Sequence, residues 1–534
     1  MNVSSIRSGA QGVYRLFERA NPLFKRELTQ SSRLTRTPWI LLGLTIVIAF
    51  VMCTVGGVSA TSTSPGEIGE ILFHTFFSIA AAVVAIAGPS LSANAIAAER
   101  EGRTWEALRL TGMPITRIAR GKFLASYAGI ALYIVVLAPV GAICSVFGGV
   151  TGLELSLAFA FLLAFAALSV AFGLAMSSLM HSSRGAILVT LFGAIFLAPI
   201  LYFFLGVGGS VLSSHVVGGF KEGAPIWVPL AITRGEFGLT YVLLAIIAPL
   251  ACLLLPAWFL YELAIANLED ANGDRASRMK VWFLSTSAVV TGLAVTIPFA
   301  AQESARFGIG LLTQVAVALY LLAAPLLFAG EADAPSKLLE ATWKRDSVSA
   351  AKRFFGPAHL RAQAMSATIG CAVWIATVTA SRLATVRNSD GESLFITGAY
   401  FAPFIMFHTA LCTYLRARSG NAWVARAGTI VVGVLLTTLP WILVILSGGT
   451  RGDGENSLAF AAPSPAFAAL LVEIERSAYR YPSAREQIQF SGVFASVFYL
   501  IGTVVLATLA VQQTRRAAAA RRATEAQTQA ALEV

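Results

Sequence analysis

The sequence predicts an all-α membrane protein that crosses the bilayer many times. Of its 534 residues, 56% are apolar and only 13% are charged, and the mean hydropathy is +0.73. A soluble core cannot absorb that much apolar surface. Twelve apolar segments are long enough to span a bilayer as helices. They lie at 39–57, 71–98, 123–149, 154–180, 185–207, 237–263, 281–300, 309–330, 367–386, 397–415, 427–447 and 490–511.

The basic residues predict how these spans are oriented. With the N-terminus in the cytoplasm, 30 of the 39 Lys and Arg fall on the cytoplasmic side and 9 on the other, whereas Asp and Glu divide 15 against 13. Lys and Arg alone set membrane topology. We therefore expect a multi-pass protein of the cell (inner) membrane with both termini cytoplasmic. The net charge of +11 is then a topology signal and an attraction to anionic membrane lipid, not a nucleic-acid surface.

The spans group into two sets of six that enter and leave on the cytoplasmic side. Long outer loops fall at equivalent places, 208–236 and 448–489, and each contains an apolar, proline-bearing piece, at 224–230 and 462–467. We expect the first piece to be re-entrant or interfacial. The predicted organisation is a cytoplasmic N-terminus with an interfacial helix at 1–38, a first six-span half at 39–263, a cytoplasmic linker at 264–280, a second half at 281–511 and a cytoplasmic tail at 512–534.

A charged segment separates spans 2 and 3. Trp105 and Leu108 stand three residues apart, and Glu101 precedes Trp105 by four, so one helical face carries an aromatic ring and a leucine beside charges. Met113-Pro114 then ends the helix. A loop that only joined two spans would need fewer residues. We therefore expect a short rigid helix that docks against another protein; the alternative is a solvated charged loop beside the membrane.

The same segment resembles the signature of ATP-binding-cassette (ABC) type-2 transporter permeases, with Arg103 between a glycine and a threonine that are adjacent in the family pattern. In that family it is the coupling helix, here about 99–113, which docks on a separate cytoplasmic ABC ATPase. The resemblance implies two copies of that ATPase, with ATP and Mg bound there and no cofactor in this chain. The matching residues are Glu99, Glu101, Gly102, Thr104, Glu106, Leu108, Pro114, Gly121 and Lys122, and Trp105 joins the predicted coupling set.

Residues 11–36 are amphipathic and basic, which is typical of a helix in the membrane interface. Asn21-Pro22 offers an N-cap and a proline at the first helical position. The run that follows resembles the elbow helix that opens the same permeases; the alternative is a plain membrane anchor. The predicted elbow residues are Pro22, Phe24, Arg26 and Leu28.

Span 4 carries small residues at four-residue spacing, Ser169, Gly173 and Ser177. Such a stripe lets two helices approach closely in lipid. We expect it to serve helix packing; the alternative is a seam between the two halves.

Several kinds of chemistry have no support in the sequence. A phosphate-binding loop needs G-x-x-x-x-G-K-[ST], but Gly121-Lys122 is followed by Phe123. The five cysteines lie in spans without C-x-x-C spacing, so neither a disulfide framework nor a metal site is predicted. We predict no catalytic residue. Within the bilayer only His74 and His408 could titrate, and we expect each to be neutral and hydrogen-bonded to a neighbouring helix.

These observations favour the membrane-spanning permease subunit of an ABC exporter, driven by ATP hydrolysis on a separate subunit. The alternatives are an ion-coupled secondary transporter and a non-transporting membrane scaffold. The sequence does not indicate the substrate.

Overall fold

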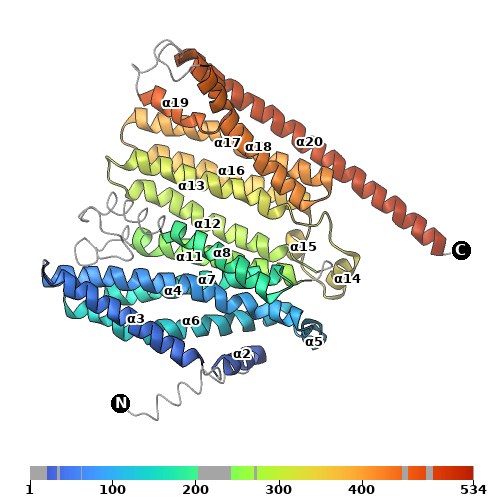
Figure 1. The fold of residues 1–534 in the computed structure, drawn as a ribbon. Helices are drawn as coiled ribbons and strands as arrows, with labels where there is room; N and C mark the ends of the chain where they lie inside the picture. Colours follow the sequence, from blue (N-terminus) through green and yellow to red (C-terminus); the bar gives the residue numbers. More distant parts are fainter. Residues whose placement is uncertain are drawn as a thin grey trace. The chain divides into compact units, whose positions relative to one another are not determined.

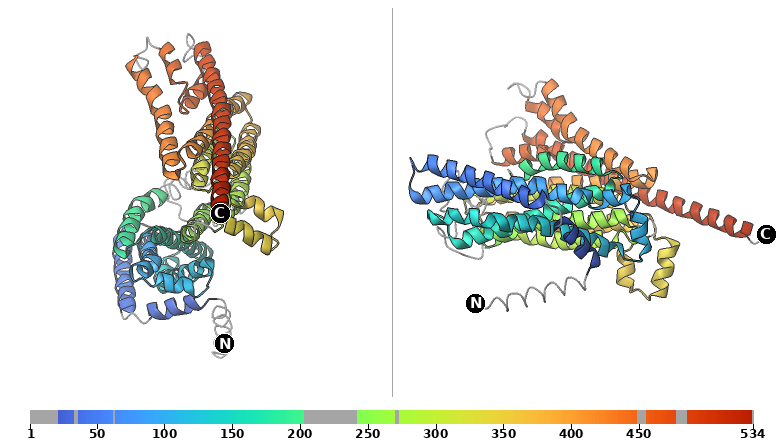
Figure 2. Two further views of the ribbon diagram at one scale, coloured as in Figure 1. Left: turned by 90° about the vertical axis from the view of Figure 1, so that its right-hand side faces the viewer. Right: turned by 60° about the horizontal axis from the view of Figure 1, so that its bottom comes forward.

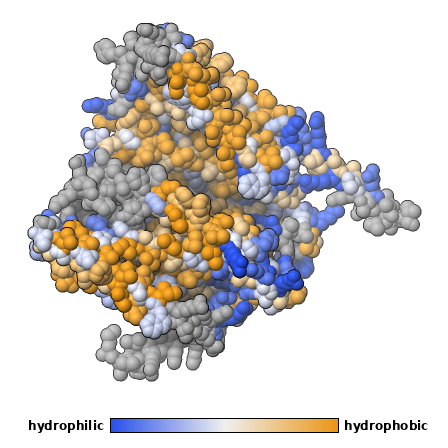
Figure 3. All heavy atoms as spheres, viewed as in Figure 1, coloured by the Kyte–Doolittle hydropathy of each residue, from blue (hydrophilic) through white to orange (hydrophobic). Residues whose placement is uncertain are grey.

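The computed structural model of the protein describes residues 21–32, 36–61, 63–202, 242–269, 273–447, 455–476 and 485–532. These residues contain helices and no strand, and twelve of the helices are long and apolar enough to cross a membrane (Figure 1). Each overlaps one predicted span, which confirms the predicted fold class. Apolar side chains cover the helices on the face shown in Figure 3, as lipid contact requires. The chain divides into two compact units, Met1–Ala271 and Asn272–Val534.

The first unit is built around two long helices, α4 and α7. Helix α4 packs against α6, α7 and α8, and α7 packs against α11. The three phenylalanines of α4, Phe73, Phe76 and Phe77, are buried in the apolar core of this unit. The predicted outer piece at 224–230 and residues 1–20 lie outside the described residues. The elements are α2 (Pro22–Ser32), α3 (Arg36–Ser59), α4 (Pro65–Glu101), α5 (Trp105–Leu110), α6 (Ile115–Val146), α7 (Gly152–Leu179), α8 (Ser183–Tyr202), η3 (Val242–Ile247) and α11 (Ala248–Leu268).

The small-residue stripe of α7 lies directly against α4. A Cβ atom on Gly173 would come within 2.1 Å of Ser92 Oγ and 2.5 Å of the Pro89 carbonyl oxygen. One turn further along, Ser177 Oγ accepts hydrogen bonds from the backbone N–H groups of Ile96 and Ala97, at 3.0 Å each. The stripe therefore packs two helices of the same unit together.

The second unit is built around α17, which packs against α13, α16, α18 and α20. The short helices α14 and α15 form a pair beside the start of α16 (Figures 1 and 2). Helix α20 continues without a break from the last span into the predicted tail. The elements are α12 (Ser277–Ala300), α13 (Arg306–Phe328), α14 (Lys337–Arg345), α15 (Ala350–Phe355), α16 (His359–Ala384), α17 (Asn388–Ser419), α18 (Ala422–Leu446), η4 (Glu455–Ala461), α19 (Phe467–Arg476) and α20 (Arg485–Leu532).

Residues 455–476, between α18 and α20, pack against α17, α18 and α20. The apolar piece at 462–467 is hydrogen-bonded to three helices. The hydroxyls of Tyr400 (α17) and Tyr499 (α20) donate to its backbone carbonyls. Ser464 Oγ accepts from the indole N–H of Trp441 (α18) at 3.1 Å. Phe467 then begins α19 in a fully buried position.

The two histidines within spans differ. His408 Nε2 lies 3.1 Å from the carbonyl oxygen of Leu322 on α13, which confirms the predicted hydrogen bond to a neighbouring helix. His74 Nδ1 is buried and has no hydrogen-bond partner among the described residues. The prediction is therefore confirmed for one histidine and not for the other.

The contact between α4 and α7 leads to a stability prediction. Gly173→Ala should lower the free energy of unfolding by about 1–3 kcal/mol, because its methyl group meets backbone atoms that cannot rotate away. Gly292→Ala on α12 is the matched control, since a Cβ there meets nothing within 4 Å. Thermal unfolding of both variants in the same detergent measures the difference. Equal melting temperatures would contradict the close packing.

Candidate functional site

A buried charge cluster joins α2, α4 and α6 in the first unit. Lys122, on α6, is only 3% exposed, and its Nζ lies 3.1 Å from Glu27 Oε1 on α2 and 3.3 Å from Glu99 Oε1 on α4. Arg26 Nη2 adds a contact of 3.4 Å to the same Glu99 oxygen. A buried ammonium group is tolerated only beside such carboxylates. The cluster therefore connects α2, α4 and α6 to one another. A cavity of about 320 Å³ adjoins it.

Helix α2 begins at Pro22, where the sequence predicts the start of the elbow helix. The Asn21 side chain accepts from the Leu23 N–H at 3.1 Å and donates to the Arg117 carbonyl at 2.6 Å, which holds α2 on α6. A Cβ atom on Gly121 would lie 2.9 Å from both polar atoms of the Asn21 side chain, so the glycine permits this approach. Of the other predicted elbow residues, Arg26 is exposed, and Phe24 and Leu28 are half-buried. An interfacial role for α2 stays a prediction.

The predicted helix at about 99–113 is wrong as one continuous element. Helix α4 runs on to Glu101, so Glu99 and Glu101 lie at the end of a span, and α5 is a separate helix of six residues. The break arises at Gly102, where α4 ends, and at Arg103, whose φ of 55° lies in the left-handed region. The Thr104 N–H and hydroxyl then both turn back to Glu99. Arg103, the residue that departs from the family pattern, thus forms the turn between α4 and α5.

Trp105 anchors α5 to the helices of its own unit. Its side chain is 7% exposed, and the Arg100 guanidinium lies 5.9 Å from the ring centroid. Leu108 packs against the same apolar cluster. The other buried members of that cluster are Leu23, Ile96, Ile118, Leu174, Ala175, Ala264 and Leu268.

Glu101 connects α4 to α8. Its carboxylate accepts the Ser183 N–H at 2.8 Å, at the first residue of α8. A carboxylate is stabilised at a helix N-terminus because the unpaired N–H groups there carry partial positive charge. Sequence reasoning identified Glu101 but missed Ser183, as it missed Glu27 as a partner of Lys122. No local signal marks these partners.

The outward side of α5 and its preceding turn, here called the α5 face, consists of Arg103, Glu106 and Leu110. All three are exposed, and Leu110 is 87% exposed. Among the predicted coupling residues, Trp105 is buried and Glu99 and Leu108 are half-buried, and the exposed ones are Glu101, Gly102, Thr104, Glu106 and Pro114. Two of the exposed residues, Glu101 and Thr104, nevertheless make the polar contacts described above.

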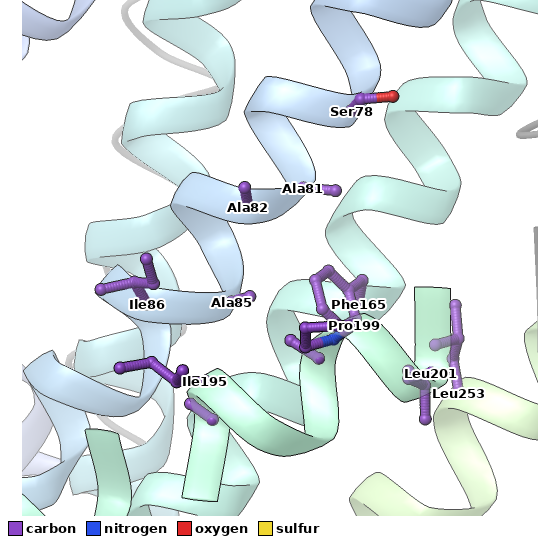
Figure 4. A pocket seen from close by; sticks show the side chains of 12 residues that line it. Ser78, Ala81, Ala82, Ala85, Ile86, Phe165, Ile195, Pro199, Leu201 and Leu253 are labelled. Carbon is purple, nitrogen blue, oxygen red and sulfur yellow. The ribbon is translucent and has the colours of Figure 1, made fainter. Parts of the chain in front are cut away.

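A second cavity of the first unit is almost wholly apolar. It has a volume of about 430 Å³ and lies between α4, α7, α8 and α11 (Figure 4). Phe165, Ile195, Pro199 and Leu253 point toward it, and Ser78 is the one labelled side chain with an oxygen. Such a lining offers a bound molecule almost no hydrogen bonds to fix its orientation. Within the described ranges, no cluster of three or more His, Cys, Asp or Glu side chains could hold a metal ion.

Comparison with known proteins points to a transporter family. Residues 54–217 match the family model described as ABC-2 family transporter protein. The matched stretch includes α4, the turn at Arg103, α5 and α7. No curated protein matches the chain. Together with the twelve candidate spans, the match supports an ABC type-2 permease, the membrane component of an ABC transporter.

Proposed function

We propose that the chain is the membrane-spanning subunit of an ABC exporter, and that its α5 face binds a separate cytoplasmic ABC ATPase. The observation that carries this proposal is Leu110. It is an almost fully exposed leucine on a helix whose opposite side is fixed by the buried Trp105. An exposed apolar side chain with charged neighbours on a rigid support fits the apolar core and polar rim of a protein interface.

The contacts of α5 support a mechanical role. Thr104, at the start of α5, donates its hydroxyl to Glu99 on α4, and Glu99 contacts Lys122 on α6. Glu101, on the last turn of α4, contacts Ser183 on α8. A displacement of α5 by a bound ATPase would therefore reach three spans through short polar contacts. ATP and Mg would bind on the ATPase, which we expect in two copies, and these residues would transmit force without catalysing a reaction.

The test is a binding measurement between the purified permease and a cytoplasmic ABC ATPase that co-purifies with it. Leu110→Glu combined with Glu106→Arg should weaken the complex at least tenfold, about 1.4 kcal/mol or more, because it places a charge at the apolar contact and reverses a charge beside it. Thermal stability should not change, since both side chains are exposed. Arg418→Glu, an exposed charge reversal in the second unit, is the control. Unchanged affinity in the double variant would show that the α5 face is not the binding site.

A further inference from the structure

The second unit contains a large groove that the proposed function does not use. Its volume is about 620 Å³, and α16, α17 and α20 line it, with Leu321 of α13. This volume lies in the range of small-molecule sites, about 300–1,000 Å³. Along α16 the lining runs from Leu360 to Ile375, which is about 22 Å at 1.5 Å per residue. The groove is therefore long enough for an extended chain.

The end of the groove at the start of α16 is polar. Gln363 is only 2% exposed, and its Nε2 donates to the Pro325 carbonyl at 3.0 Å. That bond fixes which amide atom is the oxygen. Oε1 is buried and has no hydrogen-bond partner among the described residues. An unpaired buried acceptor is unfavourable, so this site favours a ligand that brings a donor.

Arg361 adds a positive charge at the same end. Its Nη1 donates to the carbonyls of Arg353 and Phe354, at 3.2 and 3.0 Å, and its guanidinium lies 5.3 Å from the Phe354 ring centroid. These contacts hold the side chain in place without neutralising it, and in the described part of the chain no carboxylate forms an ion pair with it. A planar guanidinium with unused N–H groups matches a phosphate.

The other end of the groove is apolar and open to the side. Gly370 and Trp374 are buried along its α16 wall, whereas Ile375 on α16 and Met406 on α17 are exposed beside them. Exposed apolar side chains on spanning helices face the hydrocarbon of a bilayer. One end of the groove, near the start of α16, thus carries a positive charge and an unpaired hydrogen-bond acceptor. The other end, further along the span, is apolar.

We propose that this groove binds one anionic phospholipid whose headgroup carries a hydroxyl, such as phosphatidylglycerol. The phosphate pairs with Arg361, the hydroxyl donates to Gln363 Oε1, and an acyl chain lies along the wall that contains Gly370 and Trp374. Charge complementarity and the unpaired amide oxygen select this occupant over phosphatidylcholine, which has no net charge and no hydrogen-bond donor in its headgroup. The proposal does not depend on ATPase binding and stands if that binding fails.

The test measures phosphatidylglycerol binding to the full chain in detergent by native mass spectrometry. We expect one tightly bound lipid in the wild type and at least tenfold weaker binding in Arg361→Gln. Arg418→Gln, which removes an exposed arginine elsewhere in the second unit, should bind like the wild type. Ala367→Phe, which narrows the groove without changing its charge, should also lose the lipid. Phosphatidylcholine should bind weakly to every variant, and millimolar inorganic phosphate should not compete.

A second readout places the lipid in the groove. In a variant with Cys371 as the single cysteine, phosphatidylglycerol should slow maleimide labelling, because Cys371 lines the groove. The proposal is overturned if Arg361→Gln binds lipid like Arg418→Gln, or if phosphate alone displaces the lipid. It is also overturned if Cys371 protection follows protein concentration rather than lipid, which would indicate a second copy of the chain in the groove.

Discussion

Lys280→Met is expected to lower the free energy of unfolding by about 3–5 kcal/mol, the cost of breaking a buried ion pair by removing one partner. Lys280 is 1% exposed on α12. Its Nζ lies 2.5 Å from Glu331 Oε1 and donates to the Gly356 carbonyl at 2.8 Å. Without the ammonium, the buried Glu331 carboxylate retains the Ala358 N–H, at 2.6 Å. Denaturant unfolding in detergent measures the loss.

Glu331→Gln is expected to cost less than Lys280→Met. Burial raises the pKa of Glu331 above its ordinary value, although Lys280 opposes this effect. Glu331→Gln removes this buried charge and keeps an oxygen for the lysine, which also retains the Gly356 carbonyl as a partner. The double variant should be more stable than Lys280→Met alone, because it carries no unpaired charge. Lys352→Met, at an exposed position, is the control. If Lys280→Met lowers the free energy of unfolding no more than this control does, the ion pair makes no measurable contribution to stability.

Both units fasten the ends of their spans in the same way. In the first unit Lys122, near the start of α6, contacts Glu99 near the end of α4. In the second, Lys280 near the start of α12 contacts Glu331 just after α13. In each unit a lysine and a carboxylate are paired at the ends of candidate spans. Charges are less costly to retain there than at the centre of a span.

The sequence predicted the spans well because hydropathy is a local property. Their ends were less accurate, since caps and not hydropathy set them. Span 2 was expected at 71–98, but α4 begins at Pro65 because Ser64 and Glu67 form a capping box ahead of the apolar stretch. At the other end α4 continues past the apolar residues to Glu101, where Gly102 ends it.

The direction in which coupling residues point could not be predicted. The spacing of Trp105 and Leu108 fits a helix packed on its own spans as well as one packed on a partner. The structure settles this by bringing together residues that are distant in the chain, since Leu23, Trp105 and Leu268 belong to one buried apolar cluster. Lys122 similarly pairs with Glu27, 95 residues away. Sequence reasoning thus located the segment but not which of its side chains a partner could reach.

Trp105→Ala is expected to lower the free energy of unfolding by about 3–5 kcal/mol, the usual cost of removing a buried aromatic side chain. The indole is the largest side chain between α5 and the apolar cluster beneath it, so its loss leaves a cavity and frees α5 from its support. Under the proposed function, the same variant should lose most of its stimulation of the ATPase, although its Leu110 is unchanged. Thermal unfolding and ATP turnover of the reconstituted complex measure the two effects.

Leu110→Ala is the matched comparison, because it shortens an exposed side chain on the same helix. Its stability should equal that of the wild type while its affinity for the ATPase falls, so the two variants separate support from docking. If Leu110→Ala destabilises the protein and Trp105→Ala does not, α5 is rotated and the inward and outward residues exchange roles. If Trp105→Ala destabilises the protein but leaves stimulation intact, α5 contributes to the fold and the ATPase acts elsewhere. Transmission of force by α5 requires both losses to occur together in Trp105→Ala.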